Sequence, residues 1–244
     1  MAYENIKFVY NEPAMIVKAE SREHLVIADL HIGMELGLSK KGVHLFGASE
    51  RMAGRINAIM NQFSLRSIIM LGDIKESILY PEEAETRLLK QFFSSLEKFE
   101  IRIVAGNHDA HLSEIIGRSV EKELVIGNFG FVHGNRKPDD GFMLLDYIVS
   151  AHEHLAVRIK EKNGAAYDYK AWAVYGVNKS AARAEYKKFN ERIKLVSMPA
   201  FNELIHGRAI EKGKGGMNPM LTNNIFSSRK AEVYSLLGQR IDLG

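Results

Sequence analysis

The 244-residue sequence contains no cysteine. It therefore has no disulfide framework and no thiolate metal site, and any metal must be held by histidine, aspartate, asparagine or glutamate. No apolar run reaches the roughly 18 residues that a membrane span requires. Residues 1–10 lack the basic stretch and apolar core of a signal peptide. We expect a protein with no membrane association and a cytoplasmic location.

The charge is weak in total but uneven along the chain. A formal net charge of +3 is too small to indicate nucleic-acid binding by itself. Residues 158–194, however, carry ten Lys/Arg against four Asp/Glu, whereas the first 157 residues carry a net charge of −5. The first part of the chain is therefore acidic and the segment after it is basic.

Strand and helix patterns alternate in the first half. Compact apolar runs at 24–28, 67–71 and 101–105 predict buried strands, and two shorter strands are expected at 6–9 and 14–18. Between them, Ser49 to Phe63 and Pro81 to Leu96 show helical spacing of apolar residues. This alternation favours parallel strand pairing with crossover helices.

The pattern changes after residue 122. Residues 123–126 and 129–132 predict a hairpin around Gly127-Asn128. Further strands are expected at 146–150, 156–160 and 193–198, and residues 231–237 could close the sheet. Because no linker or repeat interrupts the chain, we expect one α/β domain over residues 1–244.

Polar clusters follow five of these strands. They are Asp29-Leu30-His31, Gly72-Asp73, Gly106-Asn107-His108-Asp109, His133 and His152-Glu153-His154. Ligands of α/β sheets bind beyond the carboxyl ends of strands. One cluster alone is weak, since Asn-His-Asp could simply cap a helix. The ordered set, however, supplies the oxygen and nitrogen donors for a pair of divalent metals, which indicates cleavage of phosphate esters.

The ordered set resembles the calcineurin-like metallophosphoesterase superfamily, whose motifs run D-x-H, G-D, G-N-H-D or -E, H, and G-H-x-H. The resemblance spans residues 29–154. Within the superfamily it is nearest to the archaeal and bacterial ICC-like phosphoesterases, whose bacterial members are associated with DNA ligase and helicase operons. The segment Met198-Pro199-Ala200-Phe201-Asn202 is similar to a sequence typical of that subgroup. The implied fold is a two-sheet αββα sandwich.

The resemblance also implies a role for each motif residue. A first metal would be bound by Asp29, His31 and His154, a second by Asn107, His133 and His152, and Asp73 would bridge the two. The catalytic residues would be His108, which lies over the scissile phosphate as a cation or general acid, and Asp109, which orients His108.

Two metals held about 3.5–4 Å apart can clamp the phosphate oxygens and generate a bridging hydroxide that attacks phosphorus. The oxygen and nitrogen donors suit Mn²⁺, Fe or Zn²⁺. By resemblance we expect two Mn²⁺ ions.

Two positions depart from the superfamily pattern. Ala151 stands where glycine usually precedes the first histidine of the last pair, and Glu76 stands where aspartate or histidine is more usual. Neither change removes a ligand. Glu76 could support a ligand from behind, but we favour a solvated charge.

The basic segment 158–194 interleaves lysines and arginines with aromatic residues, among them Tyr167, Tyr169, Trp172 and Tyr175. Basic side chains follow phosphates and aromatic rings stack on unpaired bases, so this pattern is compatible with nucleic-acid contact. The alternative is that the rings belong to the core and the charges to a solvated face, with residues 181–192 forming an ordinary amphipathic helix.

Three functions remain open. The first is a phosphodiesterase or nuclease acting on nucleic acid, DNA in preference to RNA, with DNA ligase or helicase repair machinery as expected partners. The second is a phosphatase or pyrophosphatase of a small metabolite, since metal motifs fix the reaction and the loops fix the substrate. The third is a non-catalytic scaffold, which the complete ligand set disfavours.

Overall fold

A five-stranded sheet forms the first part of the computed structural model, which describes residues 3, 5–45, 47–160, 164–210 and 216–242. Its strands are β1 (Ile6–Phe8), β2 (Met15–Ala19), β3 (Arg22–Ala28), β4 (Ser67–Leu71) and β5 (Glu100–Val104), in that spatial order. The pairs β1–β2 and β2–β3 are antiparallel, whereas β3–β4 and β4–β5 are parallel. The carboxyl ends of β3, β4 and β5 therefore meet at one edge.

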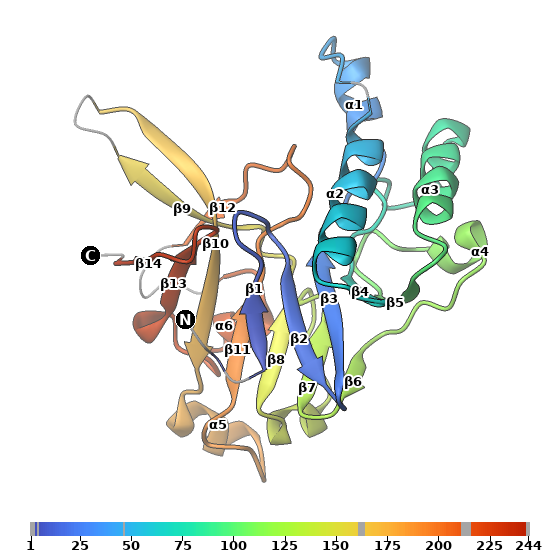
Figure 1. Ribbon diagram of the computed structural model, residues 1–244. Coiled ribbons are helices and arrows are strands. Elements are labelled where there is room, and N and C mark those ends of the chain that lie inside the picture. The colour runs from blue at the N-terminus through green and yellow to red at the C-terminus, as the bar shows by residue number, and fades with distance from the viewer. Residues whose placement is uncertain (1–2, 4, 46, 161–163, 211–215, 243–244) are drawn as a thin grey trace.

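Helices α2 (Ala48–Gln62), α3 (Glu83–Ser95) and α4 (Leu112–Ile116) cover one face of this sheet (Figure 1). Helix α1 (Met34–Lys40) lies beyond the end of α2. Helix α2 buries Met52, Ile56 and Ile59, which recur at helical spacing on one side, against the sheet. The two long helices lie where the apolar periodicity predicts them, with bounds within two residues of the expected ones.

A second sheet contains nine strands within the described residues. They are β6 (Leu124–Ile126), β7 (Phe129–Val132), β8 (Tyr147–Ser150), β9 (Leu155–Lys160), β10 (Ala166–Gly176), β11 (Lys194–Ser197), β12 (Arg208–Ala209), β13 (Glu232–Ser235) and β14 (Arg240–Ile241). The main order is β12-β9-β10-β11-β8-β7-β6, with β13 paired to β10 and β14. Strands β6 and β7 form the predicted hairpin, and β13 extends the sheet as expected.

Short helical segments lie beside the second sheet. They are the 3-10 turns η1 (Asp140–Leu144) and η2 (Ser228–Lys230) and the helices α5 (Lys179–Glu185) and α6 (Pro219–Thr222). Side chains from α5 and α6 pack with the outward residues of the sheet, such as Ala173 and Leu195. Among the described residues, no helix combines the length and apolarity needed to cross a membrane.

The two sheets pack face to face through their alternating apolar residues. On β4, Ile68 and Met70 point to the helices, whereas Ile69 and Leu71 point to the second sheet. In the interior, the ring of Trp172 stacks on Phe8 with centroids 4.5 Å apart. The layers run helix, sheet, sheet, helix, which confirms the predicted αββα sandwich.

Strand β10 accounts for much of the basic-aromatic segment. Trp172 and Tyr175 are buried within it, and Tyr186 is buried just after α5, so these rings belong to the core. Tyr167 and Tyr169 instead lie about half exposed on the hairpin of β9 and β10, which projects from the body (Figure 1). The alternative interpretation is correct for the buried rings, but the helix ends at Glu185 rather than Arg192.

The segment 198–202 connects the ends of the two sheets. The Phe201 N–H donates to the carbonyl of Ala28 at 2.8 Å, and Nδ2 of Asn202 donates to the carbonyl of Leu30 at 2.8 Å. On the other side, Nζ of Lys170 donates to the carbonyls of Ala200, at 2.7 Å, and Asn202. Burial lowers the pKa of Lys170 from 10.5 to about 8. This ammonium group therefore holds segment 198–202 in place, although burial of its charge costs solvation free energy.

The burial of Lys170 predicts a pH dependence of stability. Between pH 8 and 10.5 the unfolded chain keeps a proton on Lys170 that the folded chain has released, so the free energy of unfolding rises with pH over this window. In Lys170→Met that contribution is absent, and the rise should be smaller than in wild type. Thermal unfolding across pH 7–11 measures the difference, with the exposed Lys188→Met as control. Parallel curves for wild type and Lys170→Met would contradict the assignment.

Candidate metal centre

The loops after β3 and β4 continue the parallel pairing of their strands. The N–H of Asp29 donates to the carbonyl of Gly72, and the N–H of His31 donates to the carbonyl of Asp73. One residue further on, the N–H of Ile32 donates to the carbonyl of Ile74. The two polar motifs are therefore held in register beyond the sheet edge, where the sequence places them.

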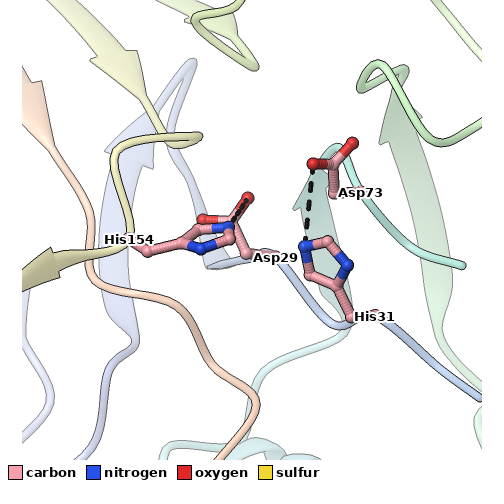
Figure 2. A group of neighbouring side chains, drawn as sticks. All are labelled: Asp29, His31, Asp73 and His154. Atoms are coloured by element: carbon pink, nitrogen blue, oxygen red, sulfur yellow. Dashed lines mark ion pairs between the residues drawn. The ribbon is translucent and has the colours of Figure 1, made fainter. Parts of the chain in front are cut away.

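The first cluster of candidate ligands consists of Asp29, His31, Asp73 and His154. One ligand atom from each lies within 4.8 Å of the others. Nε2 of His31 is 3.6 Å from Oδ2 of Asp73, and Nε2 of His154 is 3.6 Å from Oδ1 of Asp29 (Figure 2). All but His154 are buried, so the cluster combines two carboxylates and two imidazoles largely out of water.

The second cluster shares Asp73 with the first and adds His133 and His152. Nε2 of His133 is 3.2 Å from Oδ2 of Asp73 and 3.1 Å from Nδ1 of His152. These two histidines follow β7 and β8 of the second sheet, whereas Asp73 follows β4 of the first. The structure thus brings six of the seven predicted ligands together in two adjoining groups that meet at one carboxylate.

Hydrogen bonds at Nδ1 orient two of the rings. Nδ1 of His31 is 2.8 Å from Oε2 of Glu76, and Nδ1 of His133 is 3.1 Å from the carbonyl of Leu71. With Nδ1 directed at these acceptors, Nε2 is the ring nitrogen that faces Asp73 in both residues. Both rings could therefore bind a metal through the same nitrogen once it is deprotonated.

The donor set fits divalent cations, as unsatisfied buried atoms show. Nε2 of His31, Nε2 of His154 and Oδ2 of Asp29 are buried without a hydrogen-bond partner. Each such atom costs about 1–3 kcal/mol if nothing contacts it. All three belong to the first cluster, so one cation among them would satisfy them together.

Charge in the second cluster is balanced between His133 and Asp73. Burial alone would lower the pKa of His133, but the hydrogen bond to Asp73 and the charges of Asp29 and Asp73 raise it to about 9. The pKa of Asp73 is held well below its usual range by His133, against the opposing effect of burial. Burial, followed by the charge of His133, lowers the pKa of His152. A proton on His133 therefore offsets the negative charge of Asp29 and Asp73 that a bound cation would otherwise neutralise.

Backbone strain is concentrated at the candidate ligands. Five of them adopt the left-handed region that non-glycine residues rarely enter, with φ between 43° and 68°, and these are Asp29, His31, Asp73, His152 and His154. Such conformations cost of order 1–3 kcal/mol each and persist where the surroundings enforce them. Two glycines allow the close approach: a Cβ at Gly72 would lie 2.4 Å from Nδ1 of His133, and one at Gly106 would lie 2.2 Å from Oδ1 of Asp73.

His108 lies beside the first cluster on the loop after β5. Its N–H donates to Oδ1 of Asp73 at 2.9 Å, and its Nδ1 is 2.5 Å from the carbonyl of Glu76. The ring meets that of His31 edge-on with centroids 4.9 Å apart. Asn107, the remaining predicted ligand, is exposed on the same loop.

Asp109 contacts the backbone rather than the His108 ring. Its Oδ1 accepts from the N–H groups of Ile74, at 2.8 Å, and Lys75, and its Oδ2 accepts from the N–H of Gly106 at 2.8 Å. These bonds join the loops after β4 and β5, and backbone donors satisfy a buried carboxylate more completely than one imidazole could. That Asp109 orients His108 stays a prediction.

Glu76 is not the solvated charge that the sequence favours. Its carboxylate accepts from His31, its carbonyl contacts His108, and these two rings form a third cluster with it. The hydrogen bond with His31 holds its pKa below the usual range. Only its spacing after Asp73 could have indicated this, because the contacts arise from packing between loops.

Glu153 has a structural role, which the sequence does not predict. It lies between two candidate ligands but is buried and turned away from them, and its Oε1 accepts from the N–H of Asn218. Nδ2 of Asn218 in turn is 3.3 Å from Oγ of Ser150 at the end of β8. These bonds fix the loop that carries His152 and His154.

Comparisons with known proteins agree with this fold. No family model and no curated protein matches the chain. Among solved structures, the nuclease MPE of Pseudomonas putida shares 14% identity over 93% of this chain and 100% of its own, with a TM-score of 0.58. The phosphoesterase Yfce of E. coli shares 16% identity over 57% and 73%, with a TM-score of 0.36. A metallophosphoesterase of Sphaerobacter thermophilus shares 13% over 90% and 88%, with a TM-score of 0.36.

The similarity to the nuclease MPE is the informative one, since it covers 93% of this chain and all of the other. At 14% identity it establishes a shared fold. The chain is therefore an α/β protein with the two-sheet architecture of metallophosphoesterase structures, as the motifs predicted. Membership of the ICC-like subgroup stays a prediction.

The shared position of Asp73 predicts how metal binding fails in variants. Loaded with Mn²⁺ and desalted, wild type should retain about two ions per chain. Asp73→Asn should retain fewer than one, because both clusters lose a charged ligand, whereas His154→Ala should retain about one. Metal analysis by mass spectrometry measures these values, and the exposed His206→Ala serves as control. Loss of only one ion in Asp73→Asn would exclude a bridging position.

Proposed function

We propose that this chain is a two-metal phosphodiesterase that acts on nucleic acid, DNA in preference to RNA. The observation that carries the proposal is the sharing of buried Asp73 between two His/Asp clusters at the carboxyl edge of β3, β4 and β5. Ligands from both sheets are needed for the two clusters. We therefore propose residues 1–244 as one catalytic domain.

The seven residues named by the resemblance would hold the metals, with Asn107 completing the second cluster. When bound, two divalent ions, Mn²⁺ by resemblance, would polarise the phosphoryl oxygens and acidify a water molecule. The protein's own contribution is to fix the ligands beforehand. Strained backbone at Asp29, His31 and Asp73, and acceptors behind His31 and His133, leave little reorganisation for the moment of reaction.

His108 is the residue proposed to act on the leaving group. With Nδ1–H donated to the Glu76 carbonyl, its Nε2 is the ring atom left to carry a proton toward the departing oxygen. The backbone bond to Asp73 sets its distance from the cluster, and the Glu76 carboxylate lies close to its ring. Asp109 serves this arrangement as a positioning residue through the loop backbone.

The substrate class has separate support. The metallophosphoesterase-fold neighbour that aligns along nearly the whole chain is named a nuclease. No particular contact favours the alternative of a small phosphorylated metabolite, so the alternative enters as an outcome of the test below. The scaffold alternative is disfavoured by the complete donor set and its unsatisfied buried atoms. Association with DNA ligase or helicase machinery rests on the resemblance alone.

Hydrolysis of bis(p-nitrophenyl) phosphate beside p-nitrophenyl phosphate tests the reaction class. With Mn²⁺ present, we expect the diester to be hydrolysed faster than the monoester, and EDTA to abolish both activities. Labelled single-stranded DNA, duplex DNA and RNA then test the substrate. A clear preference for the monoester, with intact oligonucleotides, would favour the metabolite phosphatase. No turnover by protein that retains its metal would favour the scaffold.

The role of His108 predicts a separation of metal binding from turnover. His108→Ala should keep the Mn²⁺ content of wild type but lose about 10²- to 10⁴-fold in kcat on DNA, because a positioned general acid contributes that much. The loss should be smaller for p-nitrophenyl esters than for DNA, because p-nitrophenolate is the better leaving group. An unchanged rate on DNA would show that His108 does not serve the leaving oxygen.

A further inference from the structure

Three consecutive large apolar side chains are exposed on the loop that follows Asp73. Ile78, Leu79 and Tyr80 have exposed fractions of 58%, 77% and 63%. Single exposed apolar residues are common on protein surfaces. Three together between β4 and α3 expose apolar side chains that water solvates poorly.

Buried charged groups brace this loop from within. Nζ of Lys75, fully buried, donates to the carbonyls of Ser77, Ile78 and Leu79. The buried carboxylate of Glu85 accepts from the N–H groups of Glu76, at 3.0 Å, and Ser77, at 2.9 Å. Placing an ammonium group and a carboxylate in the interior is costly unless they are well bonded. The fold therefore supports one particular loop conformation, with its apolar side chains outward.

The bracing reaches back to the first metal motif. A Cβ at Gly33 would lie 2.6 Å from Cγ of Glu85, so the glycine two residues after His31 leaves the space that Glu85 occupies. At its far end, the loop is tied to α1 by the ion pair of Lys40 and Glu82 at 2.6 Å. The loop is thus framed by α1 and by the segment that carries Asp29 and His31.

The loop that carries the exposed residues begins at the candidate site. Glu76 contacts both His31 and His108, and two residues of chain place Ile78 within about 7 Å of it, Cα to Cα. The ring of Tyr80 lies 5.7 Å from that of His111, on the loop that carries Asn107 and His108. A substrate whose phosphate lies at the metal clusters would therefore meet this apolar surface on the His108 side.

We propose that residues 78–80 form a base-binding subsite, on which a nucleobase adjoining the scissile phosphate packs against Tyr80 and its apolar neighbours. A substrate that binds both the metal clusters and residues 78–80 must carry a phosphodiester and, on the adjoining nucleoside, a flat group with an apolar face. Nucleobases have that face only when unpaired and unstacked, so the subsite selects single-stranded nucleic acid. The inference rests on the proposed function and specifies its substrate.

The test uses thymidine oligonucleotides with one cleavable phosphodiester among methylphosphonate linkages. In matched versions, an abasic residue replaces the thymidine on one or the other side of that phosphodiester. With Mn²⁺-loaded wild type, removal of one of these two bases should lower kcat/KM by about five- to a hundredfold, the usual worth of one base–aromatic stack. Tyr80→Ala should show almost no discrimination on that side, whereas Tyr80→Phe should retain it.

Matched controls separate this subsite from general effects. Leu79→Ser should weaken the discrimination, while Leu144→Ser, equally an exposed leucine but on η1, should leave it unchanged. Hydrolysis of the abasic substrate should be similar in wild type and Tyr80→Ala, because the metal clusters and His108 are intact.

Two outcomes would overturn the proposal. Equal discrimination by wild type and Tyr80→Ala would show that the loop binds no base and would leave it as a surface for a protein partner. Failure of wild type to cleave any of the oligonucleotides, with bis(p-nitrophenyl) phosphate still hydrolysed, would instead refute the nucleic-acid substrate and the subsite with it. The two failures are distinguished by the activity of wild type alone.

Discussion

The carboxylate of Asp73 joins parts of the molecule that are otherwise separate. It lies against His31 from the loop after β3, against His133 from the second sheet, and against the N–H of His108 from the loop after β5. This convergence requires backbone to approach within a distance that no Cβ tolerates, which is why glycines stand at 72 and 106. The two sheets must pack against each other for the candidate site to form, because each sheet supplies candidate ligands that the other lacks.

The site is costly to build without a cation. Five candidate ligands adopt strained backbone, two carboxylates are buried, and three ligand atoms of the first cluster have no hydrogen-bond partner. A proton on His133, whose pKa is raised to about 9, offsets part of the negative charge. A cation held by these residues would take the place of that proton and satisfy the free atoms, so affinity for metal and stability of the fold would be linked through the same groups.

The sequence predicts the buried parallel strands and the motifs at their ends most accurately. Strand β4 has the expected bounds, Ser67–Leu71, because an apolar run covered on both faces admits few alternatives. Strand β10 was not predicted. Its outer residues alternate Tyr and Asp or Lys, which looked like a nucleic-acid surface, while its inner residues Trp172 and Tyr175 fill the core. The first half of this strand is exposed and the second half is buried, and the periodicity of the sequence does not show where one gives way to the other.

Contacts between loops could not be predicted in the same way. The candidate ligands could be named because each motif is contiguous in sequence, whereas the partners of Glu76 and Asp109 depend on how three loops pack. The same holds for Lys75 and Glu85, which carry no recognisable motif. Tertiary packing decides the hydrogen-bond partners of these polar groups, because a buried donor or acceptor must bond with whatever the fold brings near it.

Two lysines lie close to the acidic candidate site. Lys75 and Lys170 each donate to backbone carbonyls rather than to a carboxylate, yet both lie within the electrostatic influence of the site, Lys75 near Asp73 and Asp109 and Lys170 near Asp29. Placed behind the loops, they hold the walls in position and offset carboxylate charge without occupying ligand positions. The carboxylates then remain free for cations, and the phosphate of the proposed substrate would meet the charge of those cations despite the acidic first half of the chain.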